Sequence, residues 1–528
     1  MDKYFAQNSQ NKGSEFMLSV GCSPDKREVF EQICIRFNSF GYQTESGKII
    51  QTRVETLENE DLLKATKRGE FFVITPDSTI WLEQLGVPVL EQYQPDSYRI
   101  EEFVIYAVSP LVFALNPATA RRLQYPKRPF GWVNLLSEAK QNPEFRWTHP
   151  HIKCTAGLLT AFAEFYVAAG MPEYLGEDFP VNDTVLRNVR DLENSIQQYG
   201  PSEQDTISNS IHMDEWRVDA LVAQERLVVL QSAKMPSSTR PVICYPSEGA
   251  IWLDHPLVLF YHRERHPETV SAYTHLRDYL LSADAQAFLN SVGFRACGPH
   301  IRGYISTPNI SPALMEITYR QRSAAVFNLP SAEALYRISK SWYPVKRPAV
   351  ICLVIDISGS MEGPKLAEAK QGLLAFLDEI ASDQDRVGIF AFDHRVTEVA
   401  PIDTIGRNRV KLTEAIENLA SLGQTAALDA ISMAYDRLQS NFPNDPIRAA
   451  VVLTDGLENA SSIDFRTLEQ KIENGNKGPN PVAIFGLAYG EDADINMLRK
   501  IAALSGASAV EGTLSNIRAM YRQLSMFV

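Results

Sequence analysis

The stretch AVICLVIDISGS, residues 349–360, decides the fold of the C-terminal third of this chain. Its first seven residues are apolar and mostly β-branched, which predicts a strand buried on both faces of a sheet. The strand leads into Asp356, and the turn after it carries Ser358 and Ser360. One carboxylate and two hydroxyls can therefore converge at the end of this strand.

The region after this stretch alternates between apolar strands and amphipathic helices, and prolines at 344 and 348 precede it. We expect strands at residues 349–355, 387–392, 449–454 and 481–487, and helices at residues 364–380, 409–419, 427–438, 464–473, 495–504 and 514–524. This order predicts a doubly wound α/β domain with a parallel sheet over residues 349–528. Because proline disfavours both helix and central strand, we expect residues 331–348 to form a linker.

Two further loops offer oxygen atoms at the same pole of the predicted sheet. Thr425 precedes a helix, and Asp455 follows the strand at 449–454. Ligands of doubly wound sheets bind beyond the carboxyl ends of the strands, where these loops lie. Two carboxylates and three hydroxyls form a shell that suits Mg²⁺, with Mn²⁺ and Ca²⁺ as alternatives.

Together, the DxSxS motif at 356–360, Thr425 and Asp455 resemble the metal-ion-dependent adhesion site (MIDAS) of von Willebrand factor A (VWA) domains. The resemblance covers the chain from about residue 347 onward, and all five ligand positions match. It implies a metal site made of Asp356, Ser358, Ser360, Thr425 and Asp455. It also implies that a Glu or Asp from a protein partner completes the metal shell.

The region at 17–330 mixes strands and helices less regularly, and its length favours two α/β lobes. We expect a strand at 17–21, a helix at 25–37, strands at 102–107 and 111–114, and helices at 156–169 and 267–289. Lobe 1 is expected over residues 17–107 and 245–330, and lobe 2 over residues 108–244. Residues 1–16 are expected to be an extension of the kind that a tag or linker leaves.

An ordered series of short phrases in this region resembles the extracellular solute-binding proteins of bacteria, with a periplasmic-binding-protein fold. The phrases include Ser-Pro-Asp-Lys at 23–26, Thr-Pro-Asp-Ser at 75–78 and Tyr-Pro-Ser-Glu-Gly at 245–249. The resemblance implies a cleft between two lobes that binds a small polar or anionic ligand. The candidate ligand-binding residues are Ser23, Ser78, Ser109, Thr155, Ala156, Tyr245 and Glu248. The sequence Lys-Cys-Thr-Ala at 153–156 departs from the family's serine-rich helix start, so a scaffold that contacts proteins is the alternative.

His149, His151 and Cys154 lie close together in the sequence and could bind a transition metal. Pro150 and the lack of further ligands nearby in the sequence favour a loop with incidental histidines instead.

The net charge, apolar runs, cysteines and motifs of the whole chain exclude several classes of function. A formal charge of −13 argues against nucleic-acid binding, which needs a basic face. No apolar run is long enough to span a membrane or to act as a secretory signal. The six scattered cysteines favour reduced thiols. No catalytic motif places a nucleophile beside its base, so we expect a protein that is not an enzyme.

These observations predict a binding or sensing protein in which a bilobal region is coupled to a metal-dependent adhesion domain. One alternative is a transport-associated receptor for a small polar or anionic solute. Another is a cytoplasmic assembly factor that works with an AAA+ ATPase. The absence of a signal favours the cytoplasm for this chain, and the outer face of the cytoplasmic membrane is the alternative if the N-terminus is truncated.

Overall fold

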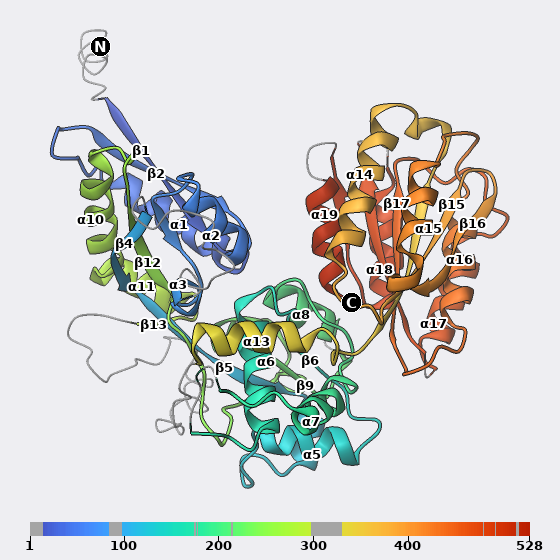
Figure 1. The fold of residues 1–528 in the computed structure, drawn as a ribbon, viewed down its shortest axis with the longest axis horizontal. Coiled ribbons are helices and arrows are strands. Elements are labelled where there is room, and N and C mark those ends of the chain that lie inside the picture. Colours follow the sequence, from blue (N-terminus) through green and yellow to red (C-terminus); the bar gives the residue numbers. More distant parts are fainter. Residues whose placement is uncertain are drawn as a thin grey trace.

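The computed structural model describes residues 14–83, 98–173, 176, 178–212, 215–296, 330–478, 480–490, 493–513 and 517–527. These residues form two lobes and a C-terminal α/β domain (Figure 1). In Figure 1, lobe 1 carries β1 and α1, lobe 2 carries α5 to α7, and the C-terminal domain is orange to red. Among the described residues, no helix combines the length and apolar character needed to cross a membrane.

Lobe 1 is built on a five-stranded sheet in the order β2-β1-β3-β12-β4. Its strands are β1 (Glu15–Cys22), β2 (Ile49–Thr56), β3 (Val73–Thr75), β4 (Tyr98–Ile105) and β12 (Pro256–His262). Its helices are α1 (Arg27–Ser39), α2 (Asn59–Lys67), α3 (Ile80–Glu83), α10 (Glu268–Leu280) and α11 (Ala283–Ser291), with a 3-10 turn at η1 (Pro24–Lys26). β1 runs parallel to β2 and β3, whereas β12 runs antiparallel to β3 and β4.

Lobe 2 is built around β5, which pairs with strands from four later parts of the chain. Its strands are β5 (Ala107–Leu115), β6 (Trp147–Thr148), β9 (Ala220–Gln224), β10 (Val242–Cys244), β11 (Trp252–Leu253) and β13 (Arg295–Ala296), beside the hairpin of β7 (Ile211–His212) and β8 (Glu215–Trp216). Its helices are α4 (Pro117–Arg122), α5 (Trp132–Gln141), α6 (Thr155–Ala168), α7 (Asp183–Glu193), α8 (Glu203–Ser210) and α9 (Glu225–Lys234). The chain returns to lobe 1 between β11 and β12, later than the expected position 245.

The expected linker at 331–348 is partly helical. Helix α13 (Ala332–Trp342) is capped by Ser331, whose hydroxyl accepts a hydrogen bond from the Ala334 amide. Its buried face, which includes Leu335 and Trp342, packs along α6 of lobe 2 (Figure 1). The prolines that suggested a linker lie after this helix, so they end it without preventing it.

The C-terminal domain has a six-stranded sheet in the order β16-β15-β14-β17-β18-β19. The strands are β14 (Ala349–Asp356), β15 (Arg386–Phe392), β16 (Val396–Thr404), β17 (Ile447–Thr454), β18 (Val482–Tyr489) and β19 (Ala509–Gly512). The helices are α14 (Pro364–Glu379), α15 (Ile405–Glu417), α16 (Ala427–Leu438), α17 (Phe465–Gly475), α18 (Ile495–Ser505) and α19 (Ile517–Leu524), with 3-10 turns at η5 (Gly359–Met361) and η6 (Ser525–Phe527). The sheet is parallel except for the edge strand β16. This arrangement confirms the predicted doubly wound α/β class.

Three details of the expected elements are wrong. The edge strands β16 and β19 were not predicted, since β16 buries Ala400 and Ile402 alone and β19 is only four residues long. The single helix expected at 267–289 is two helices, α10 and α11. They separate at Ser282, whose side chain accepts a hydrogen bond from the Ala285 amide and so starts the second helix.

The five described cysteines are buried free thiols, in agreement with the reduced state expected. They are Cys22, Cys34, Cys154, Cys244 and Cys352. Cys297 lies outside the described residues.

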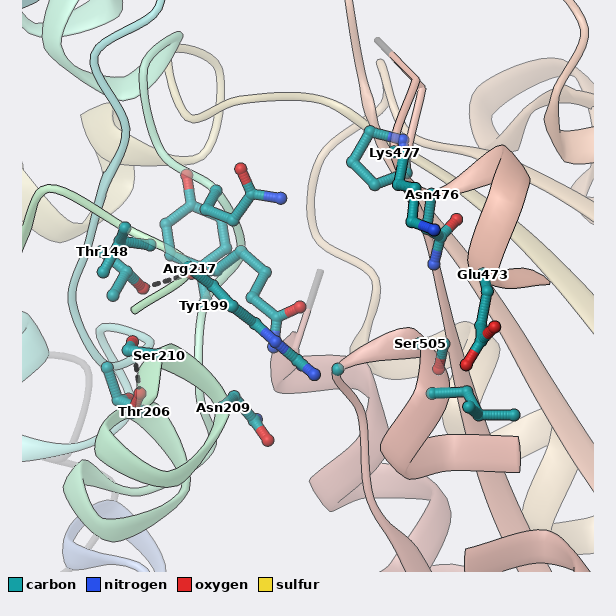
Figure 2. Close-up of a pocket in the computed structure, with 16 residues that line it drawn as sticks. Thr148, Tyr199, Thr206, Asn209, Ser210, Arg217, Glu473, Asn476, Lys477 and Ser505 are labelled. Atoms are coloured by element: carbon teal, nitrogen blue, oxygen red, sulfur yellow. Dashed lines mark hydrogen bonds between the residues drawn. The ribbon is translucent and has the colours of Figure 1, made fainter. Parts of the chain in front are cut away.

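Lobe 2 and the C-terminal domain meet around a polar pocket of about 460 Å³ (Figure 2). Thr148, Tyr199 and Arg217 line it from lobe 2, and Lys477 and Ser505 line it from the C-terminal domain. Figure 2 shows Arg217 extending across the pocket. Its guanidinium donates to the carbonyl of Ala503 over 3.2 Å.

Candidate functional site

The predicted metal-binding residues lie at one edge of the C-terminal sheet. Strands β14 and β17 are parallel neighbours, so their carboxyl ends meet. Asp356 ends β14, and Asp455 directly follows β17. Both carboxylates are fully buried, and Ser358 is 1% exposed.

Short contacts join four of the five predicted ligands. The hydroxyl oxygens of Ser358 and Ser360 are 3.0 Å apart. The Ser360 hydroxyl donates to Oδ1 of Asp455 over 2.7 Å. Oδ1 of Asp356 accepts the amide of Ser358 over 2.8 Å, and its Oδ2 accepts the hydroxyl of Thr454 over 2.6 Å. The turn after β14 is therefore held against the loop after β17.

Thr425 reaches the same point from the loop before α16. A Cβ atom placed on Gly456 would lie 3.2 Å from Oγ1 of Thr425 and 3.5 Å from Oγ of Ser360. The two hydroxyls thus flank Gly456 directly beside Asp455. The loop holds this position because the Thr425 amide donates to Asn459 over 2.9 Å. The fold brings together the oxygen atoms of all five predicted metal ligands.

The chemistry of this donor set fits a hard divalent cation. All five groups offer oxygen, and two adjacent ligands of an octahedral ion at ~2.0–2.1 Å lie about 2.9 Å apart. The contacts of 3.0 Å and 2.7 Å at Ser360 match that spacing. Burial raises the pKa of Asp356, and the nearby carboxylate of Asp455 raises it further. A cation would offset this cost of holding two buried carboxylates together.

Lys365 is a neighbour of the site that sequence reasoning missed. It lies in the first turn of α14, and its ammonium group donates to Oδ2 of Asp455. This leaves Oδ1 of Asp455 directed at Ser360. The Lys365 side chain is 31% exposed, so it neutralises part of the carboxylate charge from the solvent side. Its position nine residues after Asp356 is the sequence feature from which its place beside the site could have been inferred.

Asp77 occupies the junction of the two lobes, where the resemblance implied a ligand. Its Oδ1 accepts the hydroxyl of Ser23 over 2.6 Å, and its Oδ2 lies 3.3 Å from the donating hydroxyl of Thr155 at the start of α6. The Asn59 amide group also reaches Oδ2, over 3.5 Å. The ammonium group of Lys26 is 3.9 Å from Oδ1. A carboxylate of the chain itself is therefore bound by groups from both lobes.

The other candidate ligand-binding residues also have protein partners. The hydroxyl of Ser78 donates to Asp254 over 2.9 Å, and that of Ser109 accepts the amide of Arg226 over 3.3 Å. The Tyr245 hydroxyl donates to Glu225, which forms a bidentate pair with Arg295.

Glu248 and Ala156 complete that set. The Glu248 carboxylate accepts the amides of Trp132 and Val133 over 3.1 Å and 2.9 Å, so it caps α5. Ala156 is fully buried in the first turn of α6. The structure brings Ser23 and Thr155 together around Asp77, whereas Glu248 serves a helix end elsewhere in lobe 2.

Burial perturbs the charged groups behind Asp77. Lys26 is 1% exposed, and desolvation lowers its pKa to about 8, partly opposed by the negative charge of Asp77. Desolvation raises the pKa of Glu203 to about 7, although hydrogen bonds from Gln224 act in the opposite direction. The junction is a buried polar network in which Asp77 is hydrogen-bonded from both lobes, although Oδ1 of Asn59 and Nδ1 of His255 have no hydrogen-bond partner among the described residues.

The chain matches two protein-family models. Residues 18–295 match the family described as bacterial extracellular solute-binding protein, and residues 351–520 match the von Willebrand factor type A domain. Neither family description names an enzyme.

Two curated relatives each match about a third of the chain. An uncharacterized protein of Synechocystis sp. is 30% identical over 171 residues, which cover 32% of this chain and 38% of that protein. Human inter-alpha-trypsin inhibitor heavy chain H4 is 27% identical over 169 residues, which cover 31% of this chain and 18% of that protein. The chain therefore spans well under half of the length of these relatives.

Solved structures resemble the two parts separately. Iron-bound HitA from Pseudomonas aeruginosa is 11% identical with a TM-score of 0.42, covering 62% of this chain and 99% of that one. A von Willebrand factor type A protein from Catenulispora acidiphila is 24% identical with a TM-score of 0.30, covering 34% of this chain and 42% of that one. Similarity at this level carries no information about ligands.

The family assignment thus rests on the family models, together with the bilobal and doubly wound sheets described above. The solute-binding match covers more than half of the 528 residues. The chain belongs to the bacterial extracellular solute-binding protein family, and a von Willebrand factor type A domain follows its solute-binding region.

Proposed function

We propose that this protein is a non-enzymatic binding protein whose VWA domain holds Mg²⁺ and captures a carboxylate of a protein partner. Asp356, Ser358, Ser360, Thr425 and Asp455 hold the ion, with Mn²⁺ or Ca²⁺ as alternatives. The observation that carries the proposal is the contact of Ser360 with both Ser358 and Asp455, at 3.0 Å and 2.7 Å.

The charge balance around the ion supports capture of an anion. Two of the five proposed ligands are carboxylates, and Lys365 neutralises part of the charge of Asp455. A divalent ion with so few anionic ligands keeps enough positive charge to attract a Glu or Asp from outside. Bound there, Mg²⁺ supplies a Lewis-acidic coordination position for that carboxylate.

The rim of the site suits a protein partner. Leu422 and Leu457 lie on the loops beside Thr425 and Asp455, and they are 69% and 61% exposed. Exposed leucines beside a charged centre give an interface both an apolar contact and an electrostatic anchor. A free small carboxylate would contact the ion but not these leucines.

The solute-binding region acts as a scaffold in this proposal. Asp77 takes the hydrogen bonds of Ser23 and Thr155 that a bound anion would otherwise receive. Displacing it would leave a buried carboxylate without partners, which is costly. This arrangement favours contact with proteins over transport of a small anion. Contacts such as Lys153 with Glu379 link the scaffold to the VWA domain.

Isothermal titration of Mg²⁺ into the full chain tests the metal site. Asp356→Ala should abolish binding, because it removes a buried ligand. Asp378→Ala is the matched control, since Asp378 is 82% exposed on α14 and its removal changes the charge equally. Equal Mg²⁺ binding by wild type and Asp356→Ala would contradict the proposal.

A further inference from the structure

A buried cluster in lobe 2 joins three side chains that take part in neither site described above. His149 follows β6, Glu164 lies in the middle of α6, and Glu193 ends α7. All three side chains are 0% exposed. Nε2 of His149 lies 3.4 Å from Oε1 of Glu193 and 3.6 Å from Oε1 of Glu164. One ligand atom from each residue lies within 4.8 Å of the others.

The cluster has acceptor atoms without donors. Within the described part of the chain, Nε2 of His149 and both carboxylate oxygens of Glu164 have no hydrogen-bond partner. Nδ1 of His149 lies 2.7 Å from the carbonyl oxygen of Pro150. Because a carbonyl only accepts, Nδ1 carries a proton, and Nε2 is directed at the two carboxylates. A cation held between these buried groups would offset the cost of burying both carboxylates together.

The distances fit a tetrahedral metal ion. Ligands held at ~2.0–2.2 Å from a tetrahedral ion lie about 3.3–3.6 Å from one another. The two distances from His149 fall in that range. One divalent cation balances the charge of the two carboxylates. Glu164 keeps a second unpartnered oxygen that can serve as a fourth donor.

The groups around the cluster match those that usually support metal ligands. A metal-bound histidine commonly donates its other ring N–H to a carbonyl, as His149 does to Pro150. Ligating carboxylates are themselves hydrogen-bonded, and Glu193 accepts from the hydroxyl of Tyr199 and from the indole N–H of Trp342 over 2.5 Å. These donors orient Glu193 and leave Glu164 to face the ion.

We propose that His149, Glu164 and Glu193 bind a divalent transition-metal ion of the Zn²⁺ class. A nitrogen ligand beside two oxygen ligands favours this class over Mg²⁺. The site is separate from the VWA metal site and does not depend on the function proposed above.

This ion would stabilise the junction between the solute-binding region and the VWA domain. Trp342 ends α13, from which the chain continues into the VWA domain. Tyr199 lines the pocket of Figure 2, and its hydroxyl accepts the amide of Arg347 over 3.2 Å. The amide of Tyr199 donates to the carbonyl of Phe527, near the C-terminal end of the VWA domain, over 3.3 Å. Glu193 thus connects the ion to both ends of that domain.

Metal analysis of the full chain by mass spectrometry tests the proposal. Protein produced in zinc-supplemented medium should carry about one equivalent of Zn²⁺ at this site. The isosteric variant Glu164→Gln should lose it, whereas Asp356→Ala should retain it. Less than a tenth of an equivalent in wild type, or full retention in Glu164→Gln, would overturn the proposal.

Thermal unfolding gives a second readout that does not require a metal count. Wild type from zinc-supplemented medium should melt roughly 5–10 °C higher than wild type from metal-depleted medium. Glu164→Gln should show no such difference. If both wild-type preparations melt together and Glu164→Gln melts higher than either, the carboxylates share a proton and no metal binds.

Discussion

The lobe junction and the VWA sheet edge both bring polar side chains together near helix starts and strand ends. They differ in whether those side chains have hydrogen-bond partners within the protein. At the junction each predicted group has a complementary partner, as Ser23 and Thr155 have in Asp77. At the sheet edge oxygen donors face one another around Ser360 and Asp455. Groups that already have a protein partner have little need of a ligand, whereas a set of facing oxygen atoms has lower energy with a cation.

Of the changes considered, removing Asp77 should have the largest effect on the contrast between the lobe junction and the sheet edge. Asp77→Ala leaves Lys26 buried without its counter-charge and frees the hydroxyls of Ser23 and Thr155. We expect unfolding of the full chain to become easier by about 3–5 kcal/mol. Added sulfate should restore part of the lost melting temperature, because an anion can replace the carboxylate.

Asp284→Ala is the control for that experiment, since Asp284 is a helix residue that contacts Tyr279 and no group at the junction. Its melting temperature should not respond to sulfate. If sulfate also leaves Asp77→Ala unchanged, the junction is not an anion site that Asp77 fills.

Asp455→Asn should disable the sheet edge while leaving the junction intact. The amide keeps the size of Asp455 but removes its charge and one oxygen. We expect Mg²⁺ affinity in isothermal titration to fall roughly a hundredfold or more, since hard-cation sites depend on carboxylate charge. The melting temperature without Mg²⁺ should not fall by more than a few degrees. Unchanged affinity would remove Asp455 from the ligand set.

Lys365→Gln should show how the charge at the sheet edge affects Mg²⁺ affinity. Removing the ammonium group from Oδ2 of Asp455 makes the site more negative, so Mg²⁺ should bind roughly three- to tenfold more tightly. The effect should shrink as salt increases. Lys370→Gln is the matched control, because Lys370 lies further along the same helix and bonds only a backbone carbonyl, that of Glu417. Weaker binding by Lys365→Gln would mean that the lysine positions Asp455 for the ion.

The smallest expected effect concerns the pH response of lobe 1. Burial raises the pKa of Glu58 to about 7, and the negative charges of Asp77 and Asp61 contribute. The folded state then holds this proton longer than the unfolded chain, so the group lowers stability as pH rises from about 4.5 to about 7. Above that range its effect is constant.

Glu58→Gln should therefore melt higher than wild type at pH 8 and equally at pH 4. Melting curves at several pH values check this expectation. A difference between the two proteins that does not change with pH would contradict it. The exposed Glu60→Gln serves as a control on the same helix.

The VWA domain could be predicted well from the sequence because its signals are local. Each parallel strand is a short apolar run, and the proposed ligands Asp356 and Asp455 stand at the ends of two such runs. Strand order alone then brings them together.

Lobe 2 was harder to predict, since its contacts join distant parts of the chain. His149 was recognised beside His151 and Cys154 as a weak metal motif. Its two carboxylate neighbours, Glu164 and Glu193, come from helices α6 and α7 and carry no local signature. Asp77 lies within the Thr-Pro-Asp-Ser phrase at 75–78, but nothing in the sequence indicates that its carboxylate accepts a hydrogen bond from Thr155 of the other lobe.

The sequence by itself determined the two-part architecture, the doubly wound sheet and the set of oxygen donors at its edge. Those features follow from hydrophobic periodicity and from loops that directly follow strands. Only the tertiary structure decided that Asp77 fills the lobe junction and that His149 meets two buried glutamates. Both outcomes depend on which distant side chains share a dry interior, and the burial of charge is settled by packing across the whole fold.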